Sequence, residues 1–221
     1  MIVLGLDTAL AACSVAVTRD GEVLAAMSEP MLRGHQERLA PMVEAVMRAA
    51  ALPFAALDRV GVTVGPGSFT GLRVGLAFAK GLGLALGKPC VGVGTLEALA
   101  ASEPGPGLTA AVVDARRGQV YLQAFADGAA VMAPDALPLE TAAARLAELW
   151  RGGPLRLAGP GALLLGGIAP EALVIERTAP DPAVVCALAA GRTTPARPLY
   201  LRAPDAKLPG GLELDGRDLV Q

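Results

Sequence analysis

The sequence predicts an α/β protein built from two related halves, of which the second is reduced. In each half an apolar strand ends in an aspartate, Asp7 or Asp114, and a return strand and an Asp-Gly turn follow. The second aspartate follows the first by 107 residues, and the Asp-Gly turn at 127–128 follows the one at 20–21 by the same interval. A constant offset of this kind indicates an internal duplication.

The first half is expected to open with a three-stranded meander. Ile2–Leu6, Ser14–Thr18 and Glu22–Ser28 are short apolar runs, and Asp20-Gly21 joins the last two as a hairpin turn. A helix is expected from about His35 to Ala51, because apolar side chains recur there at i, i+3 and i+4. Together these elements form one sheet with a helix packed against it.

A strand, a glycine turn and a long helix are expected between Val60 and Gly87. Gly65-Pro66-Gly67 ends the strand because proline cannot donate to a sheet ladder, and Ser68 or Thr70 can cap the helix. Glycine inside a helix costs about 1 kcal/mol relative to alanine, so a stripe of small residues indicates close backbone approach. Two interpretations stay open, packing on the protein's own sheet and docking of a partner helix. The stripe recurs every fourth residue: Gly71, Gly75, Ala79, Gly83 and Gly87.

The run from Glu103 to Gly107 is rich in proline and glycine and predicts a linker. We therefore expect an N-terminal unit over residues 1–103 and a reduced C-terminal unit over residues 108–221. A strand at Pro89–Gly94 and a helix at Thr95–Ser102 precede the linker. The elements expected after it are strands at Ala110–Val113, Val120–Phe125 and Leu155–Ala158, helices at Glu140–Trp150 and Asp181–Ala190, a second Gly-Pro-Gly turn at 159–161, and an extended, partly mobile tail from 197 to 221.

Composition limits the function classes. The chain is 53% hydrophobic and 18% charged, yet no uncharged apolar run approaches the roughly 20 residues of a membrane helix. A net charge of −2 and only 3% aromatic residues argue against nucleic-acid binding by the chain alone. Three widely spaced cysteines outside any C-x-x-C motif suggest reduced thiols. We therefore expect a cytoplasmic protein without a signal peptide or membrane contact.

Two meander-plus-helix halves, each opening with a strand that ends in aspartate, follow the plan of the actin-like (RNase H-like) superfold, whose paired domains clamp a nucleotide. Within it, LGLDTALAACSVAV, VGVTVGPGSFTGLRVGLAFAKGL and VVDARRGQVYLQAF resemble the bacterial TsaB (YeaZ) proteins. PLYLRAPDAKLP resembles the usual end of that family. The resemblance covers nearly the whole chain.

This resemblance implies a role in making threonylcarbamoyladenosine in tRNA. The chain would be a non-catalytic partner of the larger paralogue TsaD, paired through the two helices of its N-terminal half, with the ATPase TsaE as a third member. Alone it would form a homodimer, and it would meet tRNA only through the complex. The partner-binding residues expected on this basis are His35, Leu39, Met42, Val46, Phe69, Gly71, Leu72, Gly75, Leu76, Ala79 and Gly83.

The residues themselves argue against catalysis. Catalytic paralogues are expected to hold a metal with H-x-x-x-H on the first helix, whereas this chain has one histidine, His35, and Leu39 occupies the second position. We expect no catalytic residue, no metal and no bound cofactor, although a nucleotide at the partner interface stays open. Asp7 and Asp114 are weak candidates for flanking a phosphate-bound Mg²⁺, and the alternative is that each caps a turn.

Two other functions remain as alternatives, an ATP-dependent phosphotransferase or ATPase of the same superfold, and a metallopeptidase of the glycopeptidase type. The role of Arg116 and Arg117 also stays open. They follow Asp114 in a D-A-R element and are either a solvated turn or a contact to a partner or to tRNA held by a partner.

Overall fold

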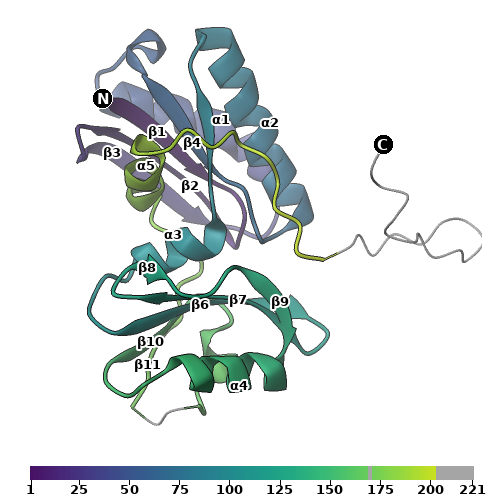
Figure 1. The fold of residues 1–221 in the computed structure, drawn as a ribbon. Coiled ribbons are helices and arrows are strands. Elements are labelled where there is room, and N and C mark those ends of the chain that lie inside the picture. The colour runs from purple at the N-terminus through teal and green to yellow at the C-terminus, as the bar shows by residue number, and fades with distance from the viewer. Residues whose placement is uncertain (169–170, 203–221) are drawn as a thin grey trace, which may run out of the picture.

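Two sheets organise the protein, one in each half (Figure 1). The structure is a computed structural model that describes residues 1–168 and 171–202. The first sheet has the strand order β3-β2-β1-β4-β5. Its strands are β1 (Ile2–Asp7), β2 (Ala12–Arg19), β3 (Glu22–Pro30), β4 (Arg59–Thr63) and β5 (Cys90–Val93).

The predicted meander is confirmed. β1 pairs antiparallel with β2, and Asp7 lies opposite Ser14 at the end of the ladder. β1 also pairs parallel with β4, which places the loops after both strands at one edge of the sheet. The helices α1 (His35–Ala49) and α2 (Phe69–Leu86) agree with the periodicity of the sequence, and Ser68 caps α2 by accepting a bond from the Gly71 amide.

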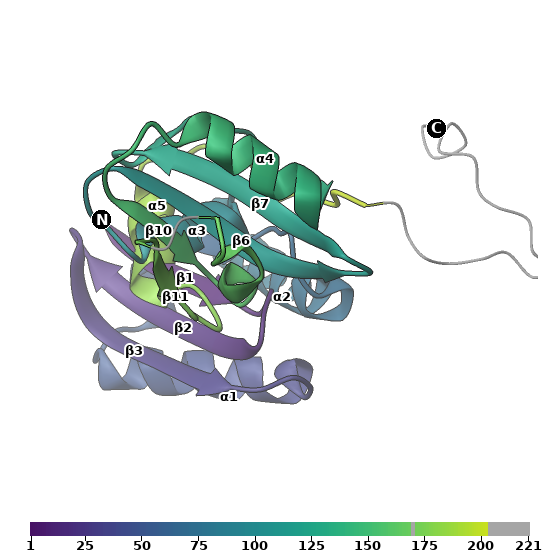
Figure 2. The same cartoon turned by 90° about the horizontal axis from the view of Figure 1, so that it is seen from below.

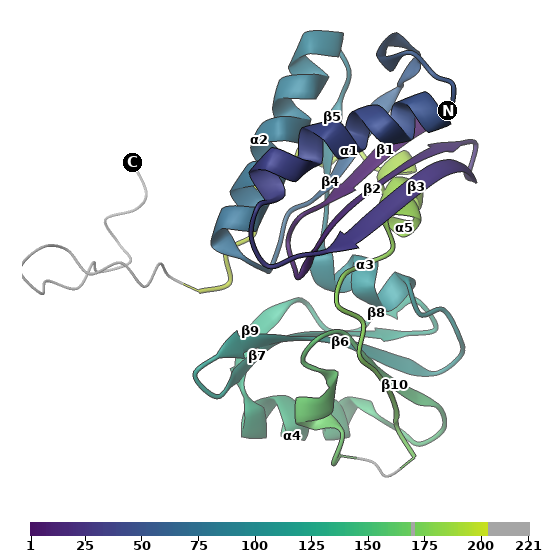
Figure 3. The same ribbon diagram turned by 180° about the vertical axis from the view of Figure 1, so that it is seen from behind.

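Alternating residues of β1 divide the core of the first unit into two layers. Leu4 and Leu6 pack with α1 and α2, whereas Val3 packs with α5 (Pro182–Ala190) on the opposite face. Figure 3 shows α1 lying across the strands, with α2 beside it and α5 on the far side of the sheet. Gly61 permits the close approach of α5, because a Cβ there would lie 2.4 Å from the Ala189 Cβ.

The second sheet has the order β11-β10-β6-β7-β8, and β9 also pairs with β7. The helix α3 (Thr95–Ala101) packs on one face of it, between the two sheets, and α4 (Leu139–Leu149) covers the other face (Figures 2 and 3). The predicted strands and helices of this half are present. The strands are β6 (Leu108–Arg116), β7 (Gln119–Ala126), β8 (Ala129–Ala130), β9 (Asp135–Pro138), β10 (Leu155–Ala158) and β11 (Leu173–Ile175).

Three details differ from the expectation. β6 continues past Asp114 to Arg116, so this aspartate lies within a strand and not at its end. The short strands β8, β9 and β11 were not predicted, since two to four residues carry too little periodicity to be recognised. Where the first unit has α2, the second has only a 3₁₀ turn at Ala162–Leu165.

The chain returns to the first sheet after the second unit. α5, which sequence analysis assigned to the C-terminal unit, packs on β1, β2 and β4. Arg59 of β4 donates to the Ala189 carbonyl at 2.8 Å, and Pro195 forms an antiparallel bridge with Val91 of β5. The first unit is therefore built from both ends of the described chain. The expectation for residues 203–221 lies outside the described residues.

Candidate functional site

The small-residue face of α2 is directed into the protein. A Cβ at Gly71 would lie 2.0 Å from the Thr8 carbonyl oxygen, and one at Gly75 would lie 2.4 Å from the Thr8 Oγ1. The Thr8 hydroxyl also donates to the Gly71 carbonyl at 2.7 Å. A Cβ at Gly83 would meet the Lys88 carbonyl at 2.9 Å. Of the two interpretations of the stripe, the structure supports packing on the protein's own sheet.

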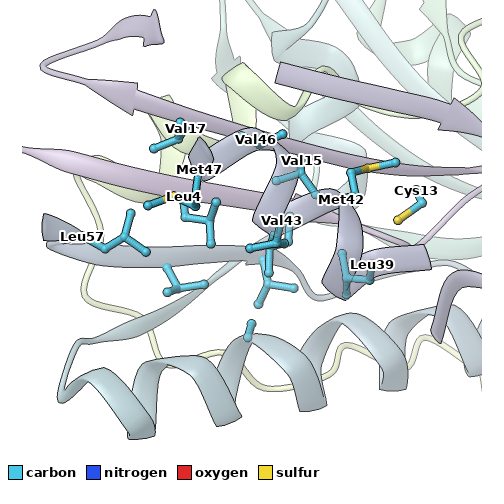
Figure 4. Packing of buried hydrophobic residues seen from close by; sticks show 14 of the residues in the cluster. Leu4, Cys13, Val15, Val17, Leu39, Met42, Val43, Val46, Met47 and Leu57 are labelled. Carbon is cyan, nitrogen blue, oxygen red and sulfur yellow. The ribbon is translucent and has the colours of Figure 1, made fainter. Parts of the chain in front are cut away.

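Most of the predicted partner-binding residues are inside the monomer. Figure 4 shows Leu39, Met42 and Val46 of α1 packed among Val15 and Val17 of the sheet. The predicted face is thus the core-facing side of each helix, which corrects the residue assignment, because a buried side chain offers no area to a partner. Only Phe69 is exposed, at 47%, and the buried positions are His35, Leu39, Met42, Val46, Gly71, Leu72, Gly75, Leu76, Ala79 and Gly83.

A groove lies on the outer side of the same helices. It has a volume of about 590 Å³ and runs between the N-terminal halves of α1 and α2. Apolar side chains form its floor, with Val74 and Phe78 half-buried and Ala77 exposed. Its other lining residues are Gln36, Leu39, Phe69, Thr70 and Arg73. We refer to these eight residues as the helix groove.

Asp7 is fully buried at the end of β1. Its Oδ1 accepts hydrogen bonds from the Thr63 hydroxyl at 2.6 Å and from the Ala9 amide at 3.2 Å, whereas its Oδ2 has no partner among the described residues. Burial raises the pKa of this carboxyl to about 6, although the two hydrogen bonds oppose that shift. Protein atoms enclose this carboxyl on all sides.

Asp114 has a different environment. Its side chain is 37% exposed, its Oδ1 accepts from the Arg116 amide at 2.7 Å, and its Oδ2 lies 3.4 Å from the Arg116 Nη1. The bond from the amide two residues on is the one that Asp7 also makes with Ala9. Both aspartates therefore make the turn contact that the alternative interpretation expects.

Among the described residues there is no group of three or more His, Cys, Asp and Glu side chains that could hold a metal ion. His35 is buried as the first residue of α1, and its Nε2 has no partner within the described chain. Leu39, one turn later, packs in the core.

The structure also brings together residues that sequence reasoning did not connect. The rings of Phe69 and Tyr200 lie 5.6 Å apart, and the Arg73 guanidinium lies 3.7 Å from the centre of the Phe69 ring. Arg202 donates to the Ala115 carbonyl at 2.5 Å, beside Arg116. Sequence analysis assigned Tyr200 and Arg202 to an extended tail, and nothing in the sequence indicated which surface they reach.

Comparison with known proteins gives consistent matches. The family model described as "TsaD: tRNA N6-adenosine threonylcarbamoyltransferase" matches residues 27–146. An uncharacterized protein of Mycobacterium tuberculosis is 39% identical over 215 residues, which cover 93% of each chain. The tRNA threonylcarbamoyladenosine biosynthesis protein TsaB of Escherichia coli is 39% identical over 124 residues, 55% of this chain and 53% of that protein.

Solved structures agree with these matches. YeaZ from Pseudomonas aeruginosa superposes with a TM-score of 0.76 at 30% identity, over 90% of this chain and 99% of that one. A ROK hexokinase from Thermus thermophilus has a TM-score of 0.52 at 14% identity, a likeness of fold alone. The predicted duplicated actin-like α/β fold with a reduced second half is confirmed.

Proposed function

Because the chain belongs to the TsaB (YeaZ) family of tRNA threonylcarbamoyladenosine biosynthesis proteins, we propose that it is a non-catalytic subunit that holds and activates the catalytic paralogue TsaD. In this proposal the two proteins pair, and the pair provides the site at which TsaE binds. The complex acts in the cytoplasm, and this subunit meets tRNA only as part of it.

The observation that carries the proposal is the helix groove. Its floor of Val74, Ala77 and Phe78 is apolar, and Ala77 is exposed to solvent between the two helices. A matching pair of helices from a paralogue would cover it and complete a four-helix layer. The inward glycine face supports this role indirectly. It fixes α2 rigidly on the sheet, so that the outer face is presented without rearrangement.

The same groove can accept a second copy of the chain. A homodimer in the absence of TsaD follows from the proposal, because an isologous contact covers the apolar floor of both copies. TsaD would displace the second copy if its contact with the groove is more extensive.

Three features support a non-catalytic role. The chain has a single histidine, and it is buried at the start of α1. Asp7 is enclosed and bonded to Thr63, so it is unsuited to hold a cation at a phosphate. Asp114 is engaged by Arg116. We propose that any nucleotide in the complex is held jointly with the partner and not by this chain alone.

Partner assembly tests the proposal. Ala77→Glu places a charge on the groove floor, and Ala85→Glu places the same charge on another exposed position of α2, outside the groove. Size-exclusion chromatography of each variant mixed with TsaD should show that Ala77→Glu remains separate and that Ala85→Glu assembles like the wild type. Complete assembly of both variants would contradict the proposal. Gly75 is unsuited to this test, because a side chain there would strike Thr8.

A further inference from the structure

The two exposed aromatic rings of the described chain touch each other. Phe69 is 47% and Tyr200 is 46% exposed, and they are the aromatic residues among the exposed large apolar side chains of the residues described. The chain is only 3% aromatic. Phe69 comes from the first turn of α2 and Tyr200 from the segment after α5, so folding brings them together from distant parts of the sequence. Large aromatic side chains normally stabilise a fold by being buried, and these two rings are not.

One arginine stacks on this pair, and two more are linked to it through the chain. The Arg73 guanidinium stacks over Phe69 on the groove side. The segment that carries Tyr200 continues to Arg202, whose guanidinium donates a hydrogen bond to the Ala115 carbonyl. Arg116 is the residue of β6 that follows Ala115. The Arg116 side chain is 86% exposed. A continuous set of contacts thus joins the first unit to the β6–β7 turn of the second. We call Phe69, Arg73, Arg116 and Tyr200 the junction face.

The β6–β7 turn has an unusual composition for its backbone. Arg116, Arg117 and Gly118 have φ values of 65°, 55° and 72°, in the left-handed region. The two other tight hairpins of the chain use Asp20-Gly21 and Asp127-Gly128 for the same region, as is usual for such turns. A left-handed conformation is less favourable for arginine than for glycine, asparagine or aspartate, so this turn departs from the usual choice of residues.

We infer that the junction face is a contact for RNA, with a base stacked on the exposed Tyr200 ring, which Phe69 supports, and phosphates beside Arg116. Exposed aromatic rings combined with guanidinium groups provide the stacking surface and the positive charge that single-stranded nucleic acid requires. Asp114 of β6, an acidic neighbour of this face, is paired with Arg116. A surface specific for an acidic peptide would have no need of the paired rings. The inference rests on the proposed function, since the contact would act on tRNA held in the complex with TsaD.

The location fits that arrangement. Phe69 and Arg73 lie at one end of the helix groove, whereas Tyr200 and Arg116 lie outside it. With the groove covered by a partner, Tyr200 and Arg116 would border the joint, and RNA bound to the partner could reach them. The net charge of −2 opposes RNA binding by the isolated chain, so without the partner the contact should be measurable only at low salt.

The test measures tRNA affinity by fluorescence anisotropy for the assembled pair, over a series of salt concentrations. Tyr200→Ala and Arg116→Asn should each weaken binding about tenfold, and Arg116→Asn should lower the salt-dependence slope by about one. Asparagine tolerates the left-handed backbone of this turn, so the fold is kept. Tyr200→Phe retains the ring and should bind as the wild type does. Arg145→Asn is the matched control, because Arg145 is exposed and paired with Glu148 on α4.

Chromatography of the same samples separates this inference from the proposed function. Unchanged tRNA affinity in both variants, with assembly intact, would overturn the junction face and leave the proposed function standing. Equal competition by polyglutamate and by single-stranded RNA would also overturn it, since the face would then recognise charge alone. Should the wild-type proteins fail to assemble, the proposed function fails, and the same variants of the isolated chain at low salt decide whether the face binds RNA.

Discussion

The hydroxyl of Thr8 donates a 2.7 Å hydrogen bond to the carbonyl of Gly71, which joins the loop after β1 to the first turn of α2. The contact is possible only because Gly71 and Gly75 have no side chains. It orients α2 so that its smooth face is inside and Val74, Ala77 and Phe78 line the groove outside. The internal packing of this helix therefore determines which residues are available to a partner.

The first prediction compares two glycines of α2. Gly71→Ala should destabilise the fold by about 2–4 kcal/mol, because the new Cβ would overlap the Thr8 carbonyl and the gain in helix propensity is only about 1 kcal/mol. Gly81→Ala should be neutral or stabilising, since nothing lies within 4 Å of a Cβ there. Urea unfolding measures both. Equal stability of the two variants would show that the Thr8 contact is not as tight as described.

The second prediction concerns the buried carboxyl of Asp7. Because its pKa is raised from 3.8 to about 6 in the folded state, the folded state binds the proton more tightly than the unfolded state does. The stability contributed by this group is therefore present below pH 3.8 and is lost as the pH rises to about 6. The loss is roughly 3 kcal/mol by linkage.

Asp7→Asn removes that titration. The free energy of unfolding of the variant minus that of the wild type should rise between about pH 4 and pH 6 and stay level above it. Denaturant unfolding at a series of pH values gives this difference directly. A difference that is flat across the range would mean that the carboxyl is solvated or paired in solution.

The third prediction concerns thiol reactivity. Burial raises the pKa of Cys186 to about 12, and its Sγ lies between α5 and the sheet, 3.5 Å from the Val3 carbonyl oxygen. Cys90 is only half-buried. With a disulfide reagent at neutral pH, a variant that retains only Cys90 should react much faster than one that retains only Cys186, which reacts when α5 detaches. Comparable rates would indicate that α5 is loosely held on the first sheet.

Local sequence patterns predicted many of the helices and strands of this fold. They did not predict contacts between residues that are far apart in the sequence. The spacing of Leu39, Met42 and Val46 predicted α1, and the helix predicted at Asp181–Ala190 is α5. The same spacing identified those side chains as an apolar face but could not tell a core from an interface, since both select the same residues. The stripe on α2 was ambiguous for the same reason, because its contact, Thr8, lies 63 residues away.

The position of α5 was missed for a similar reason. Its contact with Arg59 spans 130 residues, and a helix that is apolar on all sides has no face that indicates where it packs. The junction face depends on Tyr200 meeting Phe69, which no periodicity encodes. For the junction face, the sequence alone indicated only the PLYLR motif that contains Tyr200.

The fourth prediction separates the proposed function from the ATPase alternative. Isothermal titration of the isolated chain with ATP and Mg²⁺ should give no tight binding, because Asp7 is enclosed and Asp114 is paired with Arg116. Tight binding accompanied by phosphate release would favour the alternative. A metal analysis of the same sample tests the metallopeptidase.

The most direct test of the central claim is to measure threonylcarbamoyladenosine in tRNA after incubation with a threonylcarbamoyl donor and this chain, TsaD and TsaE, alone and together. If this chain is a helper subunit, the modified nucleoside should accumulate in the mixture that contains TsaD and this chain. This chain alone should yield none. Formation of the modified nucleoside by the isolated chain would contradict the account.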